Sequence, residues 1–122
     1  HGTTFGGNPL AMAVGNAVLD VVLADGFLAH VGQMGLLLKQ RLAELADRYS
    51  DVIEDVRGVG LMLGLKMHAP ARECMEKLRT AGLLTVASAE DNVLRILPPL
   101  IITEEHIDEA ISLFHKSQAP SP

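Results

Sequence analysis

The sequence predicts an α+β fold in which a mainly antiparallel sheet is covered by helices on one face and preceded by two long helices. Three observations predict it. The hydrophobic period changes from 3.6 to 2 near residue 50, four short strand-like segments follow, and short connections join them to further helical segments. The predicted order is helix, helix, strand, strand, helix, strand, strand, helix.

The two N-terminal helices are predicted over residues 8–23 and 25–48. Asn8 is a good N-cap and Pro9 suits the first helical position, so the first helix begins there. Apolar residues occupy nearly every side of this helix, which is typical of a helix buried between two layers. Asp25 is placed to cap the second helix, which is amphipathic.

Four strands and two helices are predicted in the rest of the chain. Residues 52–56 and 61–67 are strand-like, and the segment 57–60 between them carries two glycines that indicate a tight bend or a close backbone approach. The later elements are a helix that starts at Ala69-Pro70 and ends at Gly82, strands over 83–87 and 93–97, and a final helix capped by Thr103. We therefore expect three regions: residues 1–48 with the connecting helices, the α+β domain over 49–117, and a disordered tail over 118–122.

Composition and charge narrow the classes of function. The chain has 122 residues, so it forms at most one domain. Because 48% of the residues are hydrophobic, we expect apolar surface on the first two helices that another part of the protein or a second subunit buries. Its formal charge is −5 and its basic residues are scattered, which argues against nucleic-acid binding. No apolar run approaches the roughly 18 residues that span a bilayer. We predict a cytoplasmic protein with no membrane partner.

The single cysteine, Cys74, has no cysteine neighbour with which to form a disulfide or a metal site. It fits a reducing compartment and is predicted to be a small apolar residue on a helix face, rather than a reactive thiol. No metal site is predicted.

The N-terminal segment HGTTFGGNP places two hydroxyls and three glycines directly before a helix start. The amides at a helix N-terminus, together with the hydroxyls of Thr3 and Thr4, can bind a phosphate or a carboxylate. The alternative is a flexible glycine-rich leader that binds nothing.

Arg95 places a charge in the middle of an otherwise apolar strand. On an alternating pattern Val93, Arg95 and Leu97 share a face, and a charge on a covered face needs a partner. Arginine in such a place binds a carboxylate with its planar fork, from a ligand or from the protein, or else lies in solvent at a strand edge. For Arg57, before Gly58, a structural salt bridge is favoured.

The sequence contains few other candidate catalytic residues. The sequence has no spacing typical of a catalytic triad, no HExxH and no phosphate-binding Walker loop. Four of the five histidines are predicted at the surface or its boundary: His30, His68, His106 and His115. His1 precedes the glycine-rich segment.

Three motifs occur in a recognisable order: HGTTFGGNPLA, then VRGVGLMLGLKM, then NVLRILPPLIIT. On these motifs the chain resembles the C-terminal part of the class III pyridoxal-phosphate-dependent aminotransferases, and within that family it looks most like the acetylornithine type. The resemblance covers His1 to about His115. It implies the small C-terminal domain of a fold-type I transferase, in a homodimer with active sites at the subunit interface.

The resemblance also implies roles for three residues. Thr4 is expected to bind the phosphate of pyridoxal 5′-phosphate in the neighbouring subunit, and Thr3 to contact the substrate. Arg95 matches the arginine that receives the substrate α-carboxylate or pairs with a glutamate elsewhere in the enzyme. The implied reaction moves the δ-amino group of N-acetylornithine to a 2-oxo acid, 2-oxoglutarate, in arginine synthesis.

The family's Schiff-base lysine and its ring-nitrogen aspartate both lie upstream of the HGTTFGG motif, and neither is in this chain. None of the chain's own lysines has the neighbouring sequence that surrounds the family's Schiff-base lysine: Lys39, Lys66, Lys77 and Lys116. We therefore expect a piece of a longer enzyme, with no catalytic residue of its own and no turnover alone. The alternatives are another ω-amino acid aminotransferase, of the ornithine, succinylornithine or 4-aminobutyrate type, and a non-catalytic α+β dimerisation or binding module.

Overall fold

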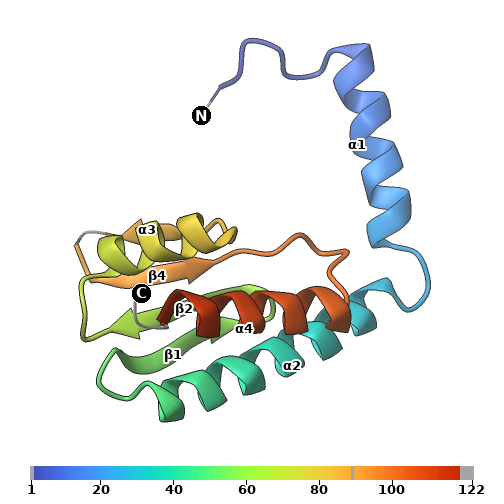
Figure 1. The fold of residues 1–122 in the computed structure, drawn as a ribbon. Coiled ribbons are helices and arrows are strands. Elements are labelled where there is room, and N and C mark those ends of the chain that lie inside the picture. The colour runs from blue at the N-terminus through green and yellow to red at the C-terminus, as the bar shows by residue number, and fades with distance from the viewer. Residues whose placement is uncertain (1, 89, 119–122) are drawn as a thin grey trace. The chain divides into compact units, whose positions relative to one another are not determined.

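The computed structural model of the chain describes residues 2–88 and 90–118 (Figure 1). The chain divides into two compact units, His1–His30 and Val31–Pro122. The division falls inside the second helix rather than near residue 48, because the later turns of that helix contribute Leu38, Leu42 and Leu45 to the core of the second unit. Of the predicted tail 118–122, Gln118 ends the last helix and the other residues lie outside the described part of the chain.

The first unit holds α1 (Pro9–Val22) and the first turn of α2 (Phe27–Arg48). Asn8 caps α1 as predicted, because its side-chain oxygen accepts a hydrogen bond from the Ala11 amide at 2.8 Å. The predicted cap of the second helix is wrong. The carbonyl of Gly26 accepts the first helical bond of α2, from His30, and the positive φ of +82° at Gly26 is one that glycine adopts without steric cost.

The second unit holds a four-stranded sheet in the order β1-β2-β4-β3, in which every neighbouring pair is antiparallel. The strands are β1 (Ile53–Val59), β2 (Met62–Met67), β3 (Val86–Ser88) and β4 (Val93–Ile96). Since β2 and β3 both run antiparallel to the β4 strand between them, they form a split β-α-β unit with α3 (Ala71–Ala81). The predicted sheet is confirmed, although β3 is shorter than expected.

The segment 57–60 differs from the prediction in its structure but not in its close packing. Arg57 and Gly58 belong to β1, and the turn follows at Gly60 with φ of +60°. A Cβ at Gly58 would overlap the Met62 carbonyl oxygen, so the backbone approach expected there is present. The hairpin also meets α2, because a Cβ at Gly35 would lie 2.7 Å from the Gly60 carbonyl carbon. Glycines at three positions therefore let this hairpin pack tightly.

Helices α2, α3 and α4 (Glu104–Gln118) bury their apolar sides in one core with one face of the sheet. Figure 1 shows α2 and α4 running side by side, and Arg41 of α2 forms an ion pair with Asp108 of α4 at 3.6 Å. The buried residues of this core lie on α2, β1, β2, α3, β4 and α4 and in two connections, and Ala87 of β3 packs against them: Leu38, Leu42, Leu45, Ile53, Leu61, Leu63, Leu65, Met67, Ala71, Cys74, Leu78, Leu94, Ile102, Ile107 and Phe114.

The opposite face of the sheet is left uncovered by the described residues. The strand register places Asp55, Arg57 and Val59 of β1 on this open face, opposite Lys66, Gly64 and Met62 of β2. Val59 and Met62 are strongly exposed, at 85% and 75%. The prediction of a sheet covered on one face is therefore confirmed within the second unit.

Asn92 holds the start of α3 against the end of β2. Its side-chain amide donates to the carbonyls of Met67 and Ala69, both at 2.9 Å, and its side-chain oxygen accepts from the Ala71 amide at 2.7 Å. The residue has a positive φ of +52°, which asparagine tolerates better than most side chains. The sequence predicts only a turn at this position, and the structure adds a helix cap supplied from 21 residues away.

Cys74 is buried in the core on α3, as predicted, with 4% of its surface exposed. Burial raises the pKa of the Cys74 thiol to about 11, a shift that the Lys77 charge opposes. The thiolate is the reactive form, so the folded protein is expected to resist a thiol reagent such as 5,5′-dithiobis(2-nitrobenzoate) at pH 8 and to react fully in denaturant. Stoichiometric labelling of Cys74 in the native protein, measured by absorbance and located by peptide mass mapping, would contradict this.

Candidate functional site

The N-terminal segment before α1 forms a tight turn that exposes its hydroxyls. Thr3 and Thr4 are both exposed, and Gly7 has a φ of +82°. A Cβ at Gly6 would overlap the Thr3 hydroxyl oxygen, so any other residue at this position would displace that hydroxyl. The segment therefore offers two hydroxyl donors on a glycine-rich turn, which is chemically suited to an oxyanion.

The helix start itself contributes less to anion binding than the sequence suggests. Pro9 has no amide hydrogen, Asn8 accepts the Ala11 amide with its side chain, and the Asn8 carbonyl accepts the Met12 amide at 3.0 Å. Among the described residues this leaves Leu10 as the one first-turn amide without a partner. Any phosphate bound here would depend mainly on the threonines and on the amides of the turn.

The first helix is exposed in the chain as described, and its expected burial between two layers stays a prediction. Helix α1 has no buried residue, and its large apolar side chains are exposed: Leu10, Met12, Val14, Val18, Leu19 and Val21. Among the described residues, the helices of the first unit are α1 and the first turn of α2. This agrees with the separate expectation that the apolar surface of this helix needs a partner beyond these residues.

Arg95 lies in the middle of β4, on the open face of the sheet, and is exposed. It forms no hydrogen bond or ion pair with any residue that the structure describes. Its strand lies between β2 and β3, so Arg95 is not at a sheet edge. Val93 shares its face as predicted, whereas Leu97 follows the end of the strand. The guanidinium is therefore held on a central strand and is available to a carboxylate.

Arg57 forms the salt bridge that the sequence favours, although a weak one. Its Nε lies 3.9 Å from Asp55 Oδ2, and both side chains are more than half exposed. An exposed pair of this geometry contributes little to stability. Arg57 and Arg95 lie on the same face of the sheet, which the sequence did not indicate.

Asp91 adds negative charge beside this face. Ser88 donates a hydrogen bond to the Asp91 carboxylate, which lowers the pKa of Asp91, and the charges of Arg95 and Lys66 act in the same direction. The backbone carbonyl of Asp91 also accepts a hydrogen bond from Lys66 Nζ. The turn between β3 and β4 is therefore anchored to β2.

The histidines lie at the surface or its boundary, as predicted: His30, His68, His106 and His115. His106 caps its own helix, since its Nδ1 lies 3.0 Å from the Thr103 hydroxyl, and His115 Nδ1 lies 2.8 Å from the Tyr49 hydroxyl. These contacts hold α4 in place and indicate structural roles. His1 lies outside the described residues, and the described residues contain no cluster of metal-ligating side chains.

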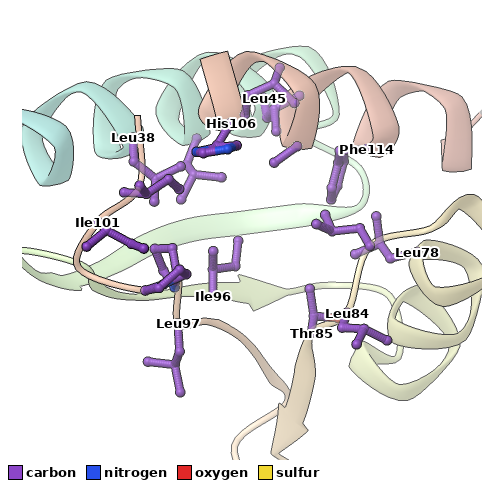
Figure 2. A pocket seen from close by; sticks show the side chains of 17 residues that line it. Leu38, Leu45, Leu78, Leu84, Thr85, Ile96, Leu97, Ile101, His106 and Phe114 are labelled. Atoms are coloured by element: carbon purple, nitrogen blue, oxygen red, sulfur yellow. The ribbon is translucent and has the colours of Figure 1, made fainter. Parts of the chain in front are cut away.

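A cavity of about 380 Å³ lies in the core of the second unit, a feature that the sequence did not predict. Figure 2 shows its apolar lining, with His106 and Thr85 on different walls. The buried Thr85 hydroxyl has no hydrogen-bond partner among the described residues. None of the described residues that line the cavity is an aspartate, glutamate, lysine or arginine, so this lining is unsuited to an amino-acid substrate.

The sequence model of the aminotransferase class-III family matches residues 1–117 of the chain. The chain belongs to the class III aminotransferases. It is 61% identical over 112 residues to acetylornithine aminotransferase of Mesorhizobium japonicum, a match that covers 92% of this chain and 28% of the relative. The chain therefore spans less than a third of the length of this relative.

Solved structures of the family share the fold. The acetylornithine aminotransferase of Elizabethkingia anophelis superposes with a TM-score of 0.84 at 34% identity, over 96% of this chain and 31% of that one. A lysine aminotransferase of M. tuberculosis gives a TM-score of 0.86 at 29% identity, over 97% and 27%. The predicted fold, the small-domain part of a pyridoxal-phosphate-dependent transferase, is confirmed.

Pyridoxal 5′-phosphate is the cofactor of this family, as predicted, and the N-terminal turn fits its phosphate. The expected phosphate donor, Thr4, has its hydroxyl exposed on this turn, and Thr3, the expected substrate contact, is exposed beside it. No single helix among the described residues is long and apolar enough to cross a membrane, and α1 and α2 pass such a test only as a broken pair.

Proposed function

We propose that the protein containing this chain moves the δ-amino group of N-acetylornithine to 2-oxoglutarate, in arginine biosynthesis. The observation that carries the proposal is the 61% identity to an acetylornithine aminotransferase over nearly the whole chain. The enzyme works in the cytoplasm as a homodimer whose active sites lie between subunits. The 122 residues supply the phosphate-binding turn, the connecting helices and the small domain.

The chemistry that pyridoxal phosphate supplies when bound is an electron sink for the transfer of the amino group. Thr4 donates its hydroxyl to the cofactor phosphate of the neighbouring subunit, and Thr3 contacts the substrate beside it. Both roles use the exposed hydroxyls on the glycine-rich turn. The lysine that binds the cofactor belongs to a part of the enzyme outside this chain, so the chain alone has no turnover.

Arg95 binds the α-carboxylate of the substrate. Its guanidinium forms no hydrogen bond or ion pair with a described residue, although its charge interacts with that of the Asp91 carboxylate, and its backbone is fixed between β2 and β3. A planar fork on a rigid strand orients a carboxylate through two parallel hydrogen bonds, which places the reacting end of the substrate reproducibly.

A second candidate function is another ω-amino acid aminotransferase. Its support is that the solved structures with this fold include ornithine aminotransferases, such as that of Plasmodium falciparum, and a lysine aminotransferase. These are only about 30% identical to the chain, whereas curated acetylornithine aminotransferases reach 61%. The acetylornithine type is therefore the better supported.

The test is glutamate formation by the full-length enzyme from 2-oxoglutarate and each of four donors: N-acetylornithine, ornithine, N-succinylornithine and 4-aminobutyrate. We expect kcat/KM to be highest for N-acetylornithine. A higher value for another donor would assign the enzyme to that type instead. No glutamate from any donor would contradict the proposed function and favour a non-catalytic module.

A further inference from the structure

Asn92 lies at the entrance to β4, three residues before Arg95. Its backbone carbonyl accepts a hydrogen bond from the Met67 amide at 3.1 Å, so the chain is attached to the end of β2 just before β4 begins. At its other end β4 runs towards Pro98 and Pro99, which have no amide hydrogen to donate to a sheet ladder. The entrance is therefore the better anchored end of the strand that carries Arg95.

The side chain of Asn92 uses its oxygen and both of its amide hydrogens. The hydrogens are donated to the carbonyls of Met67 and Ala69, both at 2.9 Å, and the oxygen accepts the Ala71 amide at 2.7 Å. Pro70 precedes α3 and forms no side-chain capping bond, so Asn92 supplies a cap that the adjacent sequence lacks. Removal of this side chain would leave these backbone groups without a partner in a partly buried place.

The backbone of Asn92 also sets how the chain enters β4. Its φ is +52°, which asparagine and glycine tolerate better than other residues. The register that follows pairs Val93 with Lys66 on one side and with Ser88 on the other, and it places Arg95 on the open face. Successive side chains of a strand alternate between faces, so a slip of one residue would turn Arg95 towards the core. Asn92 thus fixes both the start of β4 and the face that Arg95 occupies.

We propose that Asn92 is a positioning residue of the carboxylate site, which acts through Arg95. The proposal rests on the proposed function, in which Arg95 binds the α-carboxylate of the substrate. A planar fork binds a carboxylate well only when the fork itself is fixed, because a small displacement of a binding group weakens the contact. Loss of the Asn92 bonds lets the start of β4 shift, and Arg95 shifts with it. The ladder that joins β4 to β2 remains, so the sheet is retained.

The test measures KM and kcat for 2-oxoglutarate in the full-length holoenzyme with Asn92→Ala, Asn92→Gly and Asn92→Asp. We expect Asn92→Ala to raise KM roughly fivefold or more, with kcat and cofactor retention changed by less than about twofold. Asn92→Asp should recover part of the loss, because it keeps an acceptor for the Ala71 amide and tolerates the positive φ. If Asn92→Ala does not fold, Asn92→Gly carries the same test, since it loses the bonds but suits the backbone.

The control for a general loss of stability is Tyr49→Phe. The Tyr49 hydroxyl lies 2.8 Å from His115 Nδ1, in a partly buried pair that joins the end of α2 to α4. Its removal should lower Tm, as the Asn92 variants do, and leave KM for 2-oxoglutarate as in the unaltered enzyme. An equal rise of KM in Tyr49→Phe would show that any destabilisation of the second unit has this effect, and it would overturn the positioning role.

The deciding measurement is the double variant of Asn92→Ala with Arg95→Lys. If Asn92 acts through Arg95, adding Asn92→Ala to Arg95→Lys should raise KM by less than about twofold, well below its effect in the unaltered enzyme. Effects that multiply, or an unaltered KM in all three Asn92 variants, would overturn the role of Asn92 and leave the proposed function standing. An unaltered KM in Arg95→Lys, or no glutamate from the unaltered enzyme, would instead contradict the proposed function and this inference with it.

Discussion

Arg95→Lys in the full-length enzyme is expected to lower kcat/KM by about 10–100-fold for both 2-oxoglutarate and the amino donor. The expectation follows from the place of Arg95 on β4, where its guanidinium forms no hydrogen bond or ion pair with a described residue. Lysine keeps the charge but loses the planar fork, and with it one of two charge-assisted hydrogen bonds. The loss should appear mainly as a raised KM.

The control for Arg95 is Arg79→Lys. Arg79 is exposed on α3 and pairs with Glu76 of the same helix at 2.9 Å, so its replacement changes an arginine that has no role in binding. Unchanged steady-state kinetics of Arg95→Lys with glutamate and 2-oxoglutarate would remove Arg95 from the carboxylate site.

Thr4→Ala is expected to weaken the retention of pyridoxal phosphate by about 10–150-fold. A hydrogen bond from a hydroxyl to a charged phosphate contributes about 1.5–3 kcal/mol. The turn around Thr4 offers few substitutes, because Asn8 already satisfies two of the first-turn amides of α1. Equilibrium dialysis with absorbance detection of the cofactor measures the change.

The control for Thr4 is Thr80→Ala. Thr80 is an exposed threonine whose hydroxyl donates to the Glu76 carbonyl within α3, so its loss affects no ligand. We expect this variant to retain cofactor as the unaltered enzyme does. Equal affinity in Thr4→Ala and Thr80→Ala would show that Thr4 does not hold the phosphate.

The sequence predicts local features of this fold well, because their causes are local. The cap of α1 by Asn8, the left-handed glycine Gly82 at the end of α3 and the start of α4 after Thr103 each depend on residues within one turn. Asp25 is the exception. The chain bends there between two helices, and the carbonyl of Gly26, which has a positive φ, accepts the first helical bond instead.

Features set by distant residues could not be predicted in this way. The sequence predicts only a turn at Asn92, yet this residue caps a helix that begins 21 residues earlier. Only the fold brings Asn92 and the start of that helix together. The placement of Arg57 and Arg95 on one face of the sheet depends on strand order and register, which place β4 rather than β3 beside β2. For α1, the apolar pattern predicts burial, but the described residues supply no partner, so the burial stays a prediction.

The most direct test of a cofactor site shared between subunits is a hybrid dimer. One subunit carries Thr4→Ala, and the other carries a replacement of the enzyme's cofactor-binding lysine. If Thr4 serves the neighbour, the subunit with the lysine receives an intact Thr4 from its partner, and one of the two sites is complete. We expect the hybrid to show close to half the glutamate-forming activity of the unaltered dimer, at a cofactor concentration where neither variant alone is active. A hybrid no more active than a mixture of the two variant homodimers would contradict a site built from both subunits.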